Sequence, residues 1–125
     1  MWQSLRFSHS ILRLTLAFVF FWFGVDKFFH PEYWLNAWMP ESVVTLASTL
    51  GLSAVSLIYA LGVFEILVGL SLAINIFVGL FGFLAIVMLA VIPFFAGFNE
   101  VIVRDVGLIG GLLALIFWPK RPGQF

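Results

Sequence analysis

The segment Gly62-Val-Phe-Glu65-Ile-Leu-Val-Gly69 places one acid between two glycines inside a long apolar run. The next charged residue is Glu100, so every residue from 66 to 99 is uncharged. On a helix, Gly62, Glu65 and Gly69 fall at positions i, i+3 and i+7 and therefore share one face. An isolated carboxylate in lipid is costly, and backbone polar groups there must be bonded internally. We therefore expect this face to point into a helix bundle, where Glu65 needs a partner.

The composition is that of an integral membrane protein. Hydrophobic residues make up 63% and charged residues 10% of the 125 residues, whereas a soluble domain carries about 25% charged residues. The length predicts a single domain over residues 1–125. The net charge is zero, so no basic surface for nucleic acid is expected. Cysteine is absent, which excludes thiol catalysis, disulfides, cysteine-ligated zinc and iron–sulfur clusters.

Four apolar stretches have the length of membrane-spanning helices, which need roughly 20 residues at about 1.5 Å each. They lie at about residues 10–29, 53–75, 77–97 and 101–118. Between the first two, residues 42–50 carry apolar side chains on one helical face, with Ser42 as a potential N-cap and Gly51 as the stop. We therefore predict an all-α, four-transmembrane-helix bundle with a short interfacial amphipathic helix between spans 1 and 2.

An even number of spans places both termini on the same side of the membrane. More basic residues lie on the terminal side than on the other, which favours cytoplasmic termini. The basic residues on the terminal side are Arg6, Arg13, Lys120 and Arg121, and those on the other side are Lys27 and Arg104. We expect Arg13 to reach the membrane surface with its long side chain. His9 and His30 would lie on opposite sides, so they cannot together ligate a haem, and no metal site is expected.

The fourth span repeats the layout of the second. Arg104, Gly107 and Gly111 also fall at i, i+3 and i+7. Small residues allow helix backbones to approach closely, so we expect the glycine faces of the two spans to pack together. The residues predicted to serve helix packing are Gly24, Gly62, Gly69, Gly107 and Gly111.

On this topology six ionisable groups converge in the outer half of the bundle. They are Asp26, Lys27, Glu65, Glu100, Arg104 and Asp105. Glu65 is the deepest of them, and we expect its carboxyl to be either protonated or paired with Arg104. Buried ion pairs often fix helix register without taking part in chemistry. Intramembrane ionisable groups also mark substrate, proton or quinone paths. The two interpretations stay open, and under the second the candidate catalytic residues are Glu65, Glu100 and Arg104.

Three segments resemble the DoxX/DoxD-like family of small four-helix membrane proteins. They are Phe23-Gly24-Val25-Asp26-Lys27-Phe28, Glu65-x-x-x-Gly69-Leu70, and Asn99-Glu100 followed by Arg104-Asp105. The resemblance implies a four-helix bundle in the bacterial or archaeal inner membrane. It also implies that Arg13, Lys27, Glu65 and Glu100 occupy positions typical of the family.

Some members of this family are subunits of thiosulfate:quinone oxidoreductase, and others associate with membrane redox proteins. The resemblance therefore implies an accessory or structural subunit of a larger, quinone-linked electron-transfer assembly. Its partners would be the lipid bilayer and other membrane subunits, and a quinone is the one cofactor it suggests. The alternative is a quinone-linked oxidoreductase subunit that uses the ionic cluster for proton relay or anion binding. A carrier of protons or small solutes is disfavoured, because four short helices leave little room for an aqueous path.

Overall fold

The computed structural model describes residues 2–38, 41–96 and 100–118. These residues form six α-helices and no strand, which confirms the all-α prediction. The helices are α1 (Trp2–Phe29), α2 (Pro31–Trp38), α3 (Glu41–Thr49), α4 (Ala54–Ile74), α5 (Val78–Ala96) and α6 (Glu100–Ile116).

The four long helices fall close to the predicted spans, although α1 begins eight residues before the predicted start at residue 10. The prediction of one short helix between spans 1 and 2 was incomplete, because two short helices connect α1 to α4. Helix α2 begins at Pro31, and proline suits a first helical position because the N–H it lacks would have no partner there. Helix α3 begins at Glu41, so Ser42 lies inside it and is not its N-cap. Gly51 follows α3 with a φ of +79°, a conformation that glycine adopts without strain.

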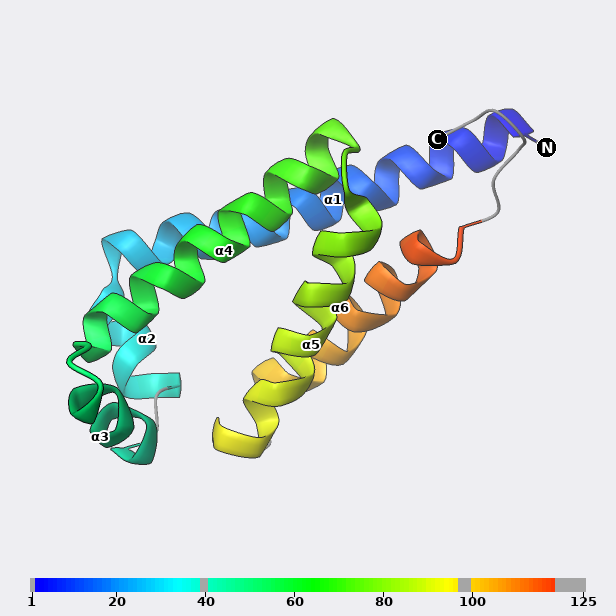
Figure 1. Ribbon diagram of the computed structural model, residues 1–125. Coiled ribbons are helices and arrows are strands. Elements are labelled where there is room, and N and C mark those ends of the chain that lie inside the picture. The colour runs from blue at the N-terminus through cyan, green and yellow to red at the C-terminus, as the bar shows by residue number, and fades with distance from the viewer. Residues whose placement is uncertain (1, 39–40, 97–99, 119–125) are drawn as a thin grey trace.

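The long helices form two pairs (Figure 1). Helix α1 lies along α4, and α5 lies along α6. The start of α1, the α4–α5 turn and the end of α6 lie at one end of the molecule, which we call the terminus end. Helices α2 and α3 and the start of α4 lie at the opposite end, which we call the loop end. The chain therefore runs back and forth between two ends, as an antiparallel bundle requires.

Among the described residues, α4 is the one helix that is long and apolar enough to cross a membrane by length and composition. Residues Val78–Val91 of α5 form a shorter apolar stretch. These properties are compatible with a membrane protein, and the four-span topology stays a prediction.

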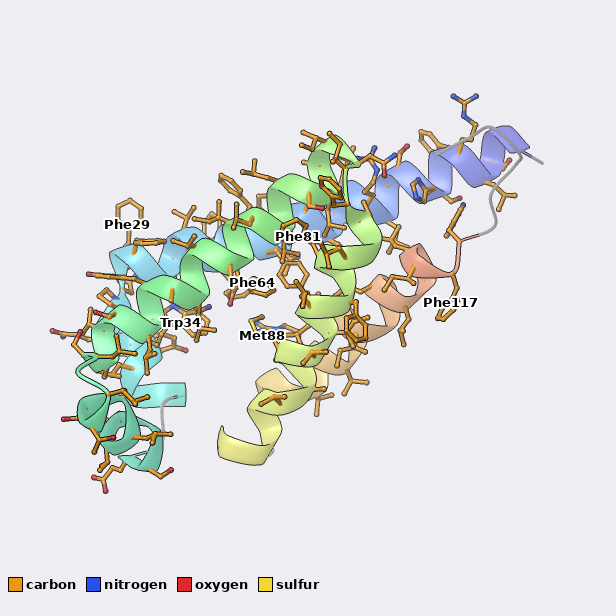
Figure 2. The ribbon with its side chains drawn as sticks, viewed as in Figure 1. Phe29, Trp34, Phe64, Phe81, Met88 and Phe117 are labelled. Atoms are coloured by element: carbon orange, nitrogen blue, oxygen red, sulfur yellow. The ribbon has the colours of Figure 1, made fainter. Side chains whose placement is uncertain are left out.

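The core lies where the two helix pairs meet, near the middle of α1. Leu16 and Phe20 of α1, Leu72 of α4 and Leu112 of α6 are buried together there. Phe64, Phe81 and Met88 pack against this core from α4 and α5, as their positions in Figure 2 show. Many large apolar side chains remain exposed on the outer surfaces, including Phe29 and Phe117. Such a surface is suited to contact with lipid or with other apolar helices.

Candidate functional site: a buried ionic cluster on the α1–α4 seam

Glycines bring the backbones of α1 and α4 into direct contact. A Cβ atom added at Gly24 would lie 2.8 Å from the carbonyl oxygen of Gly62. One added at Gly62 would lie 2.9 Å from the carbonyl oxygen of Gly24. Farther along α4, a Cβ at Gly69 would lie 3.0 Å from the carbonyl oxygen of Ala17. The glycine face of the second predicted span is therefore a packing face, and its partner is α1.

The predicted pairing of this face with the glycine face of α6 was wrong. A Cβ added at Gly107 would meet nothing within 4 Å. Gly111 faces α1 instead, since a Cβ there would lie 3.2 Å from the side chain of Leu16. Helix α6 packs chiefly on α5 and α1. Because Gly24 gives α4 a closer approach to α1, the tightest seam of the fold forms between those two helices.

The charged partner of Glu65 is Lys27, at 2.7 Å between Nζ and Oε1. Both side chains are buried, with exposed fractions of 6% and 9%. Each residue lies three positions after a seam glycine, Lys27 after Gly24 and Glu65 after Gly62. Residues three apart share a helix face, so the contact between the two glycines also brings the two charges together.

Trp34, which was not predicted as a site residue, completes this site. The Trp34 ring lies 4.0 Å from Nζ of Lys27, in cation–π geometry. Its indole N–H donates to Oδ2 of Asp26 at 2.9 Å, and Oδ1 of Asp26 lies 2.9 Å from Nδ1 of His30. Trp34 is buried, and two other aromatic residues, Tyr33 and Trp38, belong to the same short helix. No periodic signal distinguishes it from its neighbour Tyr33, so only the packing of α2 reveals its role.

The predicted Glu65–Arg104 ion pair does not form. Arg104 instead donates from Nη2 to Oδ1 of its neighbour Asp105 at 3.1 Å. Its guanidinium also lies 4.4 Å from the centre of the Phe23 ring. The reason is that α6, which carries Arg104, packs against α1, so that Arg104 lies over Phe23 of α1. Arg104 and Asp105 still lie within Coulombic range of Glu65, so a second ion pair borders the first.

Five of the six predicted cluster members can therefore be assigned contacts. Lys27 and Glu65 form the buried centre, Arg104 and Asp105 form the adjoining pair, and Asp26 lies at the rim with Trp34 and His30. Glu100 begins α6 at the same end of the molecule, but its side chain lies outside the described residues. Lys27 lies near the C-terminal end of α1 and Glu65 in the middle of α4. The placement of the cluster in the outer half of the bundle stays a prediction.

Comparison with known families accounts for most of the chain. Residues 8–97 match the model of the DoxX family. The chain belongs to the DoxX family. The match includes both members of the buried pair, Lys27 and Glu65, and ends before α6 with Arg104 and Asp105. DoxX proteins are membrane-associated, which agrees with the composition and makes this a membrane protein. No curated protein and no solved structure matches the chain.

One further charged residue of this DoxX protein, Arg13, lies away from the cluster. Arg13 donates from Nη1 to the carbonyl oxygens of Leu72 and Ala73, at 2.6 and 2.7 Å. These carbonyls belong to the last turn of α4, where helix oxygens lack partners within the helix. The guanidinium of Arg13 is therefore held at the end of α4, and the expectation that it reaches the membrane surface stays a prediction.

The two histidines of the DoxX protein lie near opposite ends of α1, and their placement on opposite sides of a membrane stays a prediction. They are 21 positions apart, which corresponds to about 32 Å of helix. His30 is exposed, as expected of an interfacial residue, whereas His9 is buried with its ring 5.3 Å from the Trp118 ring. The described residues contain no group of three or more His, Asp or Glu side chains that could hold a metal ion.

Proposed function

We propose that this DoxX protein is an accessory subunit of a larger membrane assembly, in which the ionic cluster stabilises the bundle. In this proposal α1, α4, α5 and α6 all cross a bacterial or archaeal inner membrane, with both termini in the cytoplasm. The observation that carries the proposal is the burial of Lys27 and Glu65 against each other and against Trp34.

A catalytic acid or base must be reachable by its substrate. The carboxylate of Glu65 and the ammonium of Lys27 are nearly inaccessible, and the Trp34 ring covers the ammonium. Such a pair is well suited to fix the register of α1 against α4, because a one-turn slip would leave two unpaired charges in apolar surroundings. The geometry therefore favours a structural role over a chemical one.

Partner subunits are supported by the outer surface. Large apolar side chains are exposed on every long helix, among them Trp22 of α1, Leu67 of α4, Phe83 of α5 and Val103 of α6. Membrane helices associate through such surfaces by close packing. We assign the assembly to quinone-linked electron transfer on the strength of the family relationship, since some DoxX-like proteins are oxidoreductase subunits.

A second candidate function, a quinone-linked oxidoreductase subunit, is favoured by Arg104. Its side chain is 41% exposed, so it is a cation of the cluster that a ligand can approach. In this candidate Arg104 holds an anionic substrate, and Glu65 or Glu100 relays protons. Its difficulty is that Asp105 already neutralises Arg104 at 3.1 Å.

One experiment separates the two candidates. The full chain is purified from its host membrane in a mild detergent, and co-purifying polypeptides and quinones are identified by mass spectrometry. The same is done for the double variant Lys27→Met/Glu65→Leu, which replaces both buried charges by apolar groups of similar size. We expect partner polypeptides with both proteins, and electron transfer to quinone by the assembly at a similar rate.

Loss of turnover in an assembly that retains all its subunits would refute the structural role and support the second candidate. Purification of the chain without any partner polypeptide, in a detergent that preserves other complexes of the same membrane, would refute the accessory-subunit proposal. Arg104→Gln serves as the matched variant for anion binding. It lowers turnover only if Arg104 holds the substrate.

A further inference from the structure

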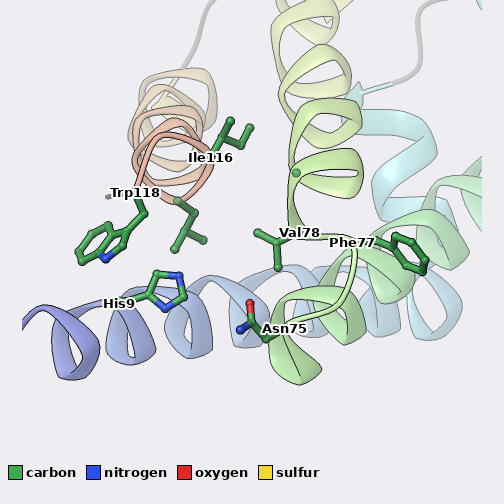
Figure 3. A pocket seen from close by; sticks show the side chains of 8 residues that line it. His9, Asn75, Phe77, Val78, Ile116 and Trp118 are labelled. Carbon is green, nitrogen blue, oxygen red and sulfur yellow. The ribbon is translucent and has the colours of Figure 1, made fainter. Parts of the chain in front are cut away.

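A pocket of about 220 Å³ lies at the terminus end, far from the ionic cluster (Figure 3). Helix α1, the α4–α5 turn, the start of α5 and the end of α6 surround it. Its polar groups come from His9, Asn75 and Trp118, and its apolar wall includes Val78, Leu115 and Ile116. Water occupies about 30 Å³ per molecule in the liquid. The pocket can therefore hold a small polar headgroup.

Among the described residues, no Lys, Arg, Asp or Glu lines the pocket, and the charged residues of α1 closest in sequence to His9 are both basic. All six acids of the chain lie elsewhere, on α1 beyond residue 25, on α2 and α3, in the middle of α4, or in the first two turns of α6. Arg6 and Arg13 lie on the same face of α1 as His9, at i−3 and i+4. With no acid nearby to neutralise them, these cations favour a ligand that carries negative charge.

Arg13 and Asn75 place hydrogen-bond donors at the terminus end. The two bonds from Nη1 of Arg13 to α4 hold its guanidinium beside the turn that carries Asn75. Nε of Arg13 is buried and has no hydrogen-bond partner among the described residues. Asn75 adopts a left-handed conformation (φ 59°, ψ 43°) as the C-cap of α4. Figure 3 shows its carboxamide directed toward the space between His9 and Val78.

The depth of the pocket agrees with a headgroup site. It adjoins the end of α4, the helix that is long and apolar enough to cross a membrane. If α4 spans the bilayer, its end lies at the level of the polar headgroups, because the hydrocarbon core is only about 30 Å thick. An amphiphile could then place its polar group in the pocket and its chains along the apolar outer surfaces.

From the pocket, the unneutralised cations and the positioned donors, we propose that the terminus-end pocket binds a negatively charged phosphate group. Two sources share this chemistry, the headgroup of an anionic phospholipid and a soluble phosphate ester. The proposal does not depend on the accessory-subunit function, because it concerns neither the ionic cluster nor any partner subunit.

The test uses the purified full chain in a detergent that carries no phosphate. Native mass spectrometry measures binding of dihexanoyl-phosphatidylglycerol, dihexanoyl-phosphatidylcholine, glycerol 3-phosphate and inorganic phosphate. We expect the anionic lipid to bind at least tenfold more tightly than the zwitterionic one. Tighter binding of the lipid than of glycerol 3-phosphate identifies a phospholipid as the source. Equal binding of the two, with the soluble ester displacing the lipid, identifies a soluble phosphate ester.

Two variants locate the binding site. His9→Phe keeps a ring of similar size without nitrogen atoms, and Asn75→Gly removes the carboxamide while permitting the positive φ. Each is expected to weaken binding of the anionic ligand about tenfold, because hydrogen bonds to charged groups are the stronger ones. Thr15→Val is the control, since Thr15 is exposed and bonds only the carbonyl oxygens of Ile11 and Leu12 within its own helix.

Equal binding of the two lipids, or no binding of any phosphate compound, would overturn the proposal. So would tight anionic binding that neither pocket variant weakens. Circular dichroism of each variant confirms that its helices have formed, so that a loss of binding reports on the pocket and not on folding.

Discussion

Helices α4 and α6 share a sequence pattern but pack differently. Each has a charged residue and glycines on one face, with Glu65 between Gly62 and Gly69 on α4, and Arg104 before Gly107 on α6. On α4 these residues join two helices, through the Gly24–Gly62 contact and the ion pair with Lys27. On α6 the ion pair joins neighbouring residues, Arg104 and Asp105, and Gly107 faces open space. A shared pattern therefore does not imply a shared role.

The difference arises from what lies opposite each face. Gly62 is opposite another glycine, so the backbones of α1 and α4 come into contact and the side chains one turn away are enclosed. Gly107 has no such partner, so α6 stays farther from its neighbours there and Arg104 remains partly exposed. If this comparison is correct, matched substitutions on α4 and α6 will have unequal effects.

The largest effect is expected from Glu65→Gln, which leaves the buried ammonium of Lys27 without its counter-charge. Breaking a buried ion pair in this way costs about 3–5 kcal/mol. Arg104→Gln is the matched change on α6 and should cost less, because the Arg104 side chain is 41% exposed whereas both side chains of the Lys27–Glu65 pair are buried. The free energy of unfolding, measured by SDS titration of the protein in mixed micelles, checks both values. Equal losses would mean that the two ion pairs have equivalent roles.

The next largest effect is expected from Arg13→Met, which removes both hydrogen bonds from α1 to the last turn of α4. Hydrogen bonds to charged groups contribute about 1.5–3 kcal/mol. The loss should appear as a lower free energy of unfolding and as faster amide exchange at residues 72–76. Arg6→Met is the control, because Arg6 is exposed on the same helix. Exchange that is unchanged in Arg13→Met would show that α4 is capped by other groups.

Gly62→Val tests the α1–α4 seam directly. Its side chain would meet the Gly24 carbonyl oxygen and the Phe28 ring at 2.9 Å, and overpacking of this kind costs about 1–3 kcal/mol. Gly107→Val places the same side chain in open space and should leave the melting temperature nearly unchanged. Thermal unfolding followed by circular dichroism compares the two variants. A similar drop for both would indicate that Gly107 packs against another helix after all, for example in a partner.

The smallest expected effect is a gain in stability, from Gly107→Ala. Gly107→Ala removes backbone freedom from the unfolded chain without a steric cost, and glycine within a helix is less favourable than alanine by about 0.5–1 kcal/mol. We therefore expect a slightly higher melting temperature. Gly24→Ala is the control, since its Cβ would lie 2.8 Å from the Gly62 oxygen and should lower the melting temperature. Stabilisation by Gly24→Ala would contradict the close seam.

The helices and their polar faces could be predicted from the amino-acid order. Long apolar runs indicate the four long helices, Pro31 and Gly51 mark breaks in the chain, and the position of Glu65 between glycines indicates a packed face. The low content of charged residues indicates a membrane protein. These features are local, since each depends on the order of neighbouring residues and on the cost of exposing polar groups to lipid.

Which helix each face meets was decided only in the tertiary structure. Glu65 could have paired with Arg104 or with Lys27, and the choice followed from the contact between Gly24 and Gly62. The burial of Trp34 and the use of Arg13 at the end of α4 likewise depend on helices distant in sequence. The physical reason is that α4 and α5 are apolar almost all round, so their hydrophobic pattern does not select a neighbour. Close packing between small residues makes that selection.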